Sequence, residues 1–111
     1  MKKLSDLNCE ACSADANPLS REEIESLLPE VEGWEVIKDS NIQKLKRLFR
    51  TGNYTKSMSF TNAVAELAES ANHHPQLIVE YSTVTVIWWS HSLKGLHKND
   101  FIMAAKASEL F

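Results

Sequence analysis

Three of the four histidines stand where regular secondary structure is expected to end, and this placement suggests acid–base chemistry. His73 and His74 are adjacent and precede Pro75, while His91 follows a strongly β-prone segment. Short loops after rigid elements are where functional groups are commonly held. An imidazole has an unperturbed pKa of about 6.5, so it can donate or accept a proton near neutral pH. We therefore expect His73, His74 and His91 to form one catalytic site.

Two acidic residues are spaced to act on these histidines. Glu69 lies four residues before His73, which puts the two side chains on one face of a helix. Asp100, at the start of the last predicted helix, could act in the same way on His91 across a loop. A helix C-terminus also favours a cationic ring by about 0.3 to 1 kcal/mol. One histidine of the adjacent pair is therefore the candidate general acid.

Other interpretations of these residues stay open from the sequence. Adjacent histidines at a helix end can serve only to cap it, and three imidazoles also suit a zinc ion in a metal-dependent hydrolase. However, neighbouring side chains on an extended backbone diverge, which fits separate roles better than one shared ion. Cys9 and Cys12 could be half of a zinc site or a redox pair. Because no second such pair exists, we expect two reduced thiols.

The composition is that of a single globular domain. The chain has 111 residues, 43% of them hydrophobic, with 12 Lys and Arg against 15 Asp and Glu. A net charge of −3 argues against a nucleic-acid-binding surface, which needs a basic excess. The one basic run is expected to be a solvated strand face; its members are Lys44, Lys46, Arg47 and Arg50. No apolar run is long enough for a membrane span and no secretory signal is visible, so we expect a cytoplasmic protein.

The elements that must position these residues follow from local patterns. Residues 1–19 form a polar leader, and residues 20–111 form one domain. A capping box of Ser20 and Glu23 predicts the first helix. Residues 34–37 and 42–49 predict a hairpin, with imperfect alternation that suggests a bulge in its second strand. A helix is expected over residues 54–71, ended by Asn72, which tolerates a left-handed backbone.

The second half of the chain repeats the hairpin and adds a last helix. Strands are expected over residues 77–81 and 84–90, with a turn at 82–83, and a helix begins between residues 97 and 100. The order α-β-β-α-β-β-α predicts an α+β fold, a four-stranded antiparallel sheet covered by helices on one face. The strand at 84–90 places Trp88 and Trp89 on opposite faces, so the open face needs cover, for example from a second subunit. Either indole could form an aromatic wall for a ligand.

Two sequence blocks resemble a known family. The first is Glu69-Ser70-Ala71-Asn72-His73-His74-Pro75 with Tyr81 and the β run at 84–88, and the second spans residues 88–105. In this order and spacing they resemble the pterin-4a-carbinolamine dehydratases, also known as the dimerisation cofactor of a homeodomain transcription factor, and the second block is similar to the bacterial branch. The resemblance runs from residue 20 to residue 110. Ser90 stands where many members have Thr.

The resemblance implies an activity and a set of roles. Members dehydrate 4a-hydroxytetrahydropterin to quinonoid dihydropterin, which recycles the tetrahydropterin used by aromatic amino-acid hydroxylases. They use no metal and no organic cofactor, and they form homodimers or homotetramers. On this basis His73 or His74 is the expected acid and His91 the base. The residues expected to bind or orient the pterin are Glu69, Pro75, Trp89 and Asp100. The alternative is an interaction protein of the same fold, a dimerisation cofactor that binds a regulatory protein partner.

Overall fold

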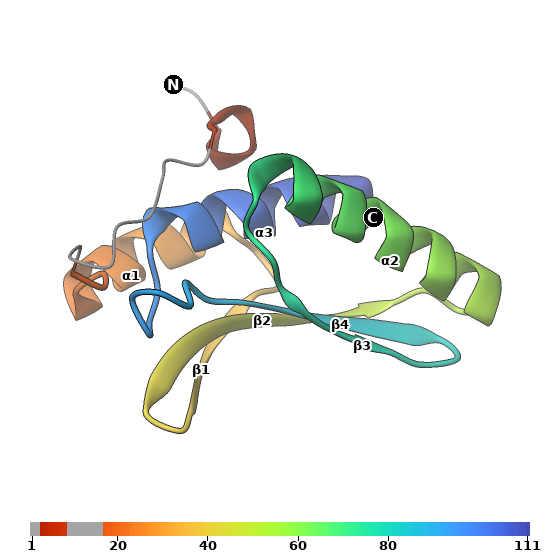
Figure 1. Cartoon of the computed structure of the whole chain (residues 1–111), viewed down its shortest axis with the longest axis horizontal. Helices are drawn as coiled ribbons and strands as arrows, with labels where there is room; N and C mark the ends of the chain where they lie inside the picture. The colour runs from red at the N-terminus through yellow and green to blue at the C-terminus, as the bar shows by residue number, and fades with distance from the viewer. Residues whose placement is uncertain (1–2, 9–16) are drawn as a thin grey trace.

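The computed structural model describes residues 3–8 and 17–111, and within them it confirms the predicted element order (Figure 1). Short 3-10 helices lie at Leu4–Asp6 and Leu28–Glu30. The helices and strands are α1 (Arg21–Leu27), β1 (Glu35–Asp39), β2 (Ile42–Arg50), α2 (Tyr54–Ala71), β3 (Gln76–Val79), β4 (Thr83–Trp88) and α3 (Lys98–Leu110). No helix among these residues is long and apolar enough to cross a membrane. Cys9 and Cys12 lie outside the described residues.

The strands form one antiparallel sheet in the order β1-β2-β4-β3, and helices α1, α2 and α3 lie on one side of it, as predicted (Figure 1). The register places Leu45 of β2 between Val36 of β1 and Trp88 of β4. These three side chains therefore share the face that meets the helices. The opposite face carries the alternate residues of each strand, and no helix among the described residues covers it, although Thr85 and Ile87 in the central strand β4 are buried there as well.

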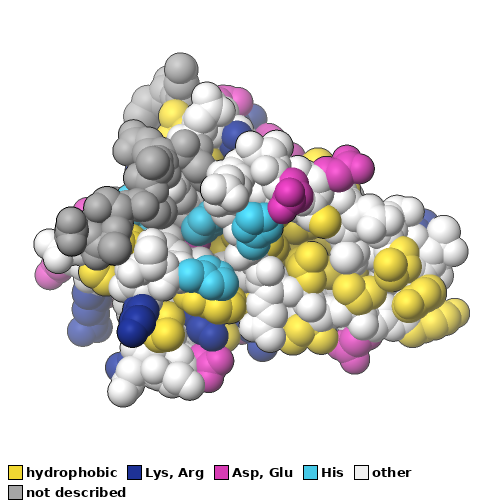
Figure 2. Space-filling model, viewed as in Figure 1, with side chains coloured by type: hydrophobic (Ala, Val, Ile, Leu, Met, Phe, Trp, Pro, Cys, Tyr) yellow, Lys and Arg dark blue, Asp and Glu magenta, His cyan; other side chains and the backbone are white. Residues whose placement is uncertain are grey.

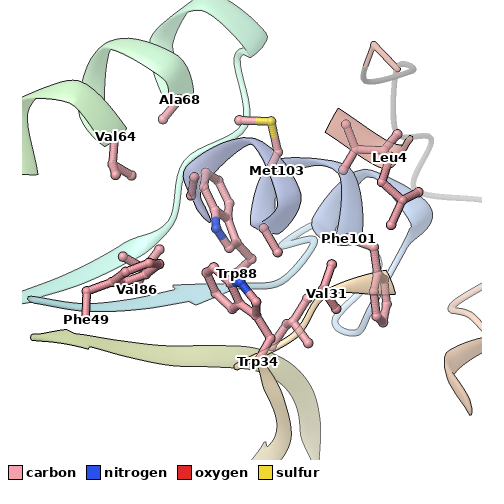
Figure 3. Packing of buried hydrophobic residues seen from close by; sticks show 14 of the residues in the cluster. Leu4, Val31, Trp34, Phe49, Val64, Ala68, Val86, Trp88, Phe101 and Met103 are labelled. Atoms are coloured by element: carbon pink, nitrogen blue, oxygen red, sulfur yellow. The ribbon is translucent and has the colours of Figure 1, made fainter. Parts of the chain in front are cut away.

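The core lies between the sheet and helices α2 and α3 (Figure 3). The predicted alternation along β4 is confirmed, because Val84, Val86 and Trp88 are fully buried on the helix side. Val64 and Ala68 meet them from α2 at helical spacing, which is how an amphipathic helix covers a sheet. Met103, Phe101 and their neighbours fill the space from α3 (Figure 3).

Capping residues fix the helix ends where the sequence predicted them. The Ser20 hydroxyl accepts from the Glu23 N–H at 3.2 Å, and a Glu23 carboxylate oxygen accepts from the Ser20 N–H at 2.9 Å. The bonds from the Ser20 backbone N–H and side chain lower the pKa of Glu23, since they favour its charged form. At the other end of the domain's longest helix, Asn72 takes the left-handed conformation with φ 50° and ψ 43°.

Four local predictions differ from the structure. The pairing of β2 is continuous, so the expected bulge is absent. The alternation of apolar and polar residues looked imperfect because the polar residue Arg47 lies on the sheet face that meets the helices. Its guanidinium donates there to Ser108 Oγ at 3.0 Å. The chain reverses across Glu80–Ser82, so Thr83 begins β4 instead of ending the turn, and β4 ends at Trp88. Within the predicted leader, Leu4 is buried against the core.

Truncation of a core residue should destabilise the domain far more than truncation at an exposed helix end. We expect Leu45→Ala to lower the free energy of unfolding by about 2 to 5 kcal/mol, because Leu45 is fully buried and a cavity would remain. Leu110→Ala is the matched control, since Leu110 is 45% exposed, and should change it by less than about 0.5 kcal/mol. Urea unfolding measures both. Equal losses would contradict the packing described here.

Candidate active site

The predicted site residues come from three places that meet at one end of the sheet. His73 and His74 form the link from α2 to β3, His91 lies in the turn after β4, and Asp100 is in the first turn of α3. Histidine side chains gather in one patch on the face shown in Figure 2, below the end of α2. Acidic side chains lie at the edge of this patch (Figure 2).

The left-handed backbone at Asn72 decides how the adjacent pair is oriented. The N–H of His73 donates to the carbonyl of Ala68 at 3.1 Å, which closes the end of α2. From this position the His73 side chain turns inward, with only 12% of it exposed, while the His74 side chain is 51% exposed. The predicted divergence of the two rings is therefore confirmed. One imidazole faces the interior and the other faces solvent.

His73 is held by a buried carboxylate and an indole. Its Nε2 lies 2.6 Å from Asp100 Oδ1, and Asp100 is fully buried. Its ring also lies parallel to that of Trp88, with centroids 5.7 Å apart and planes 4° apart. A short ring N–H to carboxylate bond of this kind is charge-assisted when the imidazole is protonated. Asp100 and Trp88 together thus fix the orientation of the His73 ring.

The second oxygen of Asp100 connects the start of α3 to the end of β4. Asp100 Oδ2 accepts from Ser90 Oγ at 2.9 Å and from the backbone N–H of His97 at 2.9 Å. The latter bond belongs to a capping box in which His97 Nδ1 accepts from the Asn99 N–H at 3.0 Å. The fourth histidine therefore caps α3. Asp100 was expected to act on His91, but the structure pairs it with His73.

Glu69 also has a different partner from the one expected. Its Oε1 lies 2.5 Å from His74 Nε2, so Glu69 pairs with His74 and not with His73. The spacing of four residues predicts a pair of Glu69 with His73 only if the helix continues as far as His73. The left-handed backbone at Asn72 ends the helix, so the His73 side chain points away from Glu69. The His74 side chain reaches Glu69 in the last turn of α2 instead. Both side chains of this pair are half-exposed or more, so water screens it.

His91 has a different environment from the other two imidazoles. Its ring stacks on Trp89, with centroids 4.4 Å apart and planes 11° apart. Within the part of the chain that the structure describes, no hydrogen bond or ion pair is formed by the His91 ring. Trp89 in turn carries the ammonium of Lys44 at 4.0 Å from its ring centroid. His91 is thus an exposed imidazole of the site, and none of the carboxylates in residues 3–8 and 17–111 pairs with it.

A chain of contacts brings the three histidines into one region. Ser90 precedes His91 and donates to Asp100, which pairs with His73, and His73 is followed by His74. Pro75 then leads into β3, whose first residue Gln76 lies opposite Ile87 of β4. Among residues 3–8 and 17–111, no three His, Cys, Asp or Glu side chains are grouped so as to hold a metal ion.

Ser90, Trp88 and Lys44 contribute contacts that sequence reasoning did not assign. The available signal for Ser90 was its hydroxyl, which it shares with the Thr expected there from the family resemblance. Trp88 and Lys44 offered no such signal, because a strand's alternation reports which face a residue occupies and not which ring it touches.

Comparisons with known proteins agree with the resemblance seen in the sequence. The sequence model of the family described as "Pterin 4 alpha carbinolamine dehydratase" matches residues 17–110. A protein of Nitrosococcus oceani named "Putative pterin-4-alpha-carbinolamine dehydratase" is 50% identical over 110 residues, 99% of this chain and 97% of that protein. A Vibrio cholerae protein of the same name is 50% identical over 107 residues, 96% of this chain and 98% of its own length.

A solved structure also resembles this chain. It is the crystal structure of a transcriptional coactivator/pterin dehydratase from Brucella melitensis, with a TM-score of 0.77 and 28% sequence identity. The match covers 85% of this chain and 98% of the Brucella chain. The likeness therefore extends over most of this chain.

The two histidine–carboxylate pairs should differ strongly in their contribution to stability. Asp100→Asn removes a fully buried charge that pairs with His73, so we expect a loss of about 3 kcal/mol in the free energy of unfolding. Glu69→Gln removes an exposed partner of His74 and should cost less than about 1 kcal/mol. Urea denaturation of both variants measures the difference. An unchanged free energy of unfolding in Asp100→Asn would show that this carboxylate does not hold the ends of α2, β4 and α3 together.

Proposed function

Because the chain belongs to the pterin 4 alpha carbinolamine dehydratase family, we propose that it removes water from a 4a-hydroxytetrahydropterin to give quinonoid dihydropterin. The observation that carries this proposal is the site itself: two imidazoles with carboxylate partners lie in the same region as a third imidazole, to which the described part of the chain gives no such partner. Dehydration of a carbinolamine requires an acid and a base, and these residue types supply both.

The reaction is balanced by two proton transfers. The acid donates a proton to the 4a-hydroxyl oxygen, and the C4a–O bond breaks so that its electron pair leaves with water. The base removes the proton from N5, and the electrons of that N–H bond form the C4a=N5 double bond. No electrons enter or leave overall, and proton exchange with solvent restores the acid and the base.

We assign the acid to the adjacent pair, His73 or His74. Each has a carboxylate within hydrogen-bonding distance, Asp100 for His73 and Glu69 for His74. A carboxylate stabilises the protonated imidazole through a charge-assisted hydrogen bond, and a protonated ring is the form that can donate. Asp100 and Glu69 are then orienting residues, and Pro75 keeps the backbone of His74 extended.

We assign the base to His91. It is exposed, and the described residues offer it no carboxylate that would stabilise its protonated form. A neutral imidazole is the form that can accept the N5 proton. The stacked ring of Trp89 fixes its plane at 4.4 Å. A bicyclic pterin would contact His91 on one side and the adjacent pair on the other.

The wider role follows from the same proposal. The product would be reduced back to tetrahydropterin, so the enzyme would serve tetrahydrobiopterin recycling beside an aromatic amino-acid hydroxylase. A cytoplasmic location stays a prediction, as does the division into a leader at 1–19 and a domain at 20–111.

A second candidate function is supported by the printed title of the Brucella melitensis structure, which names a transcriptional coactivator as well as a pterin dehydratase. By that analogy this chain would bind a regulatory protein partner through its surface. Three histidines held in separate environments favour the enzyme, because partner binding alone does not require them.

Stopped-flow dehydration of freshly generated 4a-hydroxytetrahydropterin tests the assignment. We expect His91→Ala, and one of the two variants His73→Ala and His74→Ala, to reduce the rate by about 10² to 10⁴, the range for a general acid or base. His74→Ala in parallel identifies the acid, which is the histidine of the pair that shows the larger loss. Circular dichroism controls for folding. His91→Ala with wild-type turnover would refute the base role, and activity lost after exhaustive chelation would favour a metal-dependent enzyme.

We also propose that the chain forms a homodimer or homotetramer through the open face of the sheet. Leu48 and Ile78 both lie opposite Thr85 in the register and are 44% and 41% exposed, so two exposed apolar side chains flank Thr85 on this face. Light scattering should give a mass two or four times that of the 12.6 kDa chain. Leu48→Glu should reduce it to the monomer while Leu110→Glu should not. A monomeric wild type would overturn this proposal.

A further inference from the structure

Lys44 does not behave as the solvated residue that the basic run predicted. It lies on the open face of β2, yet it is only 8% exposed, which is rare for lysine. Its Nζ lies 3.0 Å from Asp39 Oδ2 and 4.0 Å from the ring centroid of Trp89. Both contacts satisfy the buried charge. The prediction of a solvated face is therefore wrong at Lys44, because the hairpin and the indole enclose it.

Trp89 needs such a support because it lies beyond the last residue of β4. The pairing of β2 with β4 ends at Leu45 opposite Trp88, so the regular ladder no longer sets the direction of the next side chain. Lys44 is the neighbour of Leu45 on β2, and its ammonium reaches the indole there. A cation over an indole is held by the negative face of the ring, which fixes the plane of that ring.

His91 depends on the same indole. It is exposed, and its stacking on Trp89 is the contact that orients its ring among the described residues. Asp39, Lys44, Trp89 and His91 thus form a continuous series of contacts that begins in the first hairpin and ends at the candidate base. A base acts efficiently only when its nitrogen is directed at the proton it removes.

We propose that Lys44 is a positioning residue for the dehydration: it holds the indole of Trp89, and the indole holds the ring of His91 in the direction that the base requires. This rests on the proposed function in assigning the base to His91. Lys44 does not touch the substrate, since its ammonium is buried and committed to Asp39 and Trp89. Trp89 acts in the same way as a support for the imidazole, and not as a wall for the pterin.

Proton NMR tests the positioning without any assay of activity. Stacking on an indole shifts the ring protons of His91 upfield. In Lys44→Met, which keeps the length but loses the charge, these resonances should move toward their unstacked positions. Lys44→Arg should retain the shift, because a guanidinium also stacks on an aromatic face. Lys46→Met is the matched control on the same face of the same strand. An unchanged His91 spectrum in Lys44→Met would overturn the proposal.

Kinetics then show whether the positioning serves the reaction. We expect Lys44→Met to lower kcat about tenfold with KM little changed, while Lys46→Met keeps both. In a His91→Ala background, Lys44→Met should add no further loss, because the two residues act as one unit. A full additional loss there, or a change in KM alone, would overturn the proposal.

Two further comparisons separate the possible failures. If His91→Ala loses activity but Lys44→Met does not, the base assignment stands and the positioning role fails. If His91→Ala keeps wild-type activity, the base assignment itself fails. Should Lys44→Met not fold, Trp89→Phe and Trp89→Leu take its place. Trp89→Leu should lose clearly more of kcat than Trp89→Phe, because only the phenylalanine leaves an aromatic face for His91, and equal rates in the two would contradict the role of the stack.

Discussion

The buried carboxylate of Asp100 joins the ends of the three elements that carry the candidate site. Asp100 is fully buried and uses both oxygens, one toward His73 after α2 and the other toward Ser90 after β4 and the N–H of His97 at the start of α3. A buried charge is costly unless it is paired and hydrogen-bonded. The three elements are therefore held together at the point where their ends meet. The candidate site lies at this junction, and the three ends cannot separate there without leaving the Asp100 carboxylate unpaired.

The three imidazoles gain different properties from their surroundings. His73 is inside, against Asp100 and Trp88, while His74 is outside with Glu69, and His91 stands on Trp89. Identical side chains can take different roles when different neighbours fix their orientation and their exposure to solvent. The stack on Trp89 also links the site to the first hairpin through Lys44, so that a residue outside the histidine cluster bears on its geometry.

Much of the fold could be predicted from local patterns. The bounds 54–71 of α2 and the left-handed residue at its end followed from an apolar stripe and an asparagine, and both agree with the structure. The alternation along β4 predicted which of its side chains meet the helices. The partners of Glu69 and Asp100 could not be predicted, because they depend on how Asn72 turns the chain and on how α3 approaches the sheet. The burial of Lys44 was equally hidden, since a basic residue in a strand gives no indication that an indole follows the end of the neighbouring strand.

A crystal structure with bound 7,8-dihydrobiopterin, an unreactive analogue of the product, tests the central claim most directly. If the three imidazoles form the site, the bicyclic ring lies between His91 on one side and the His73–His74 link on the other, with C4a and N5 directed at imidazole nitrogens. A pterin ordered elsewhere on the chain, with none of the three imidazoles in contact, would contradict it.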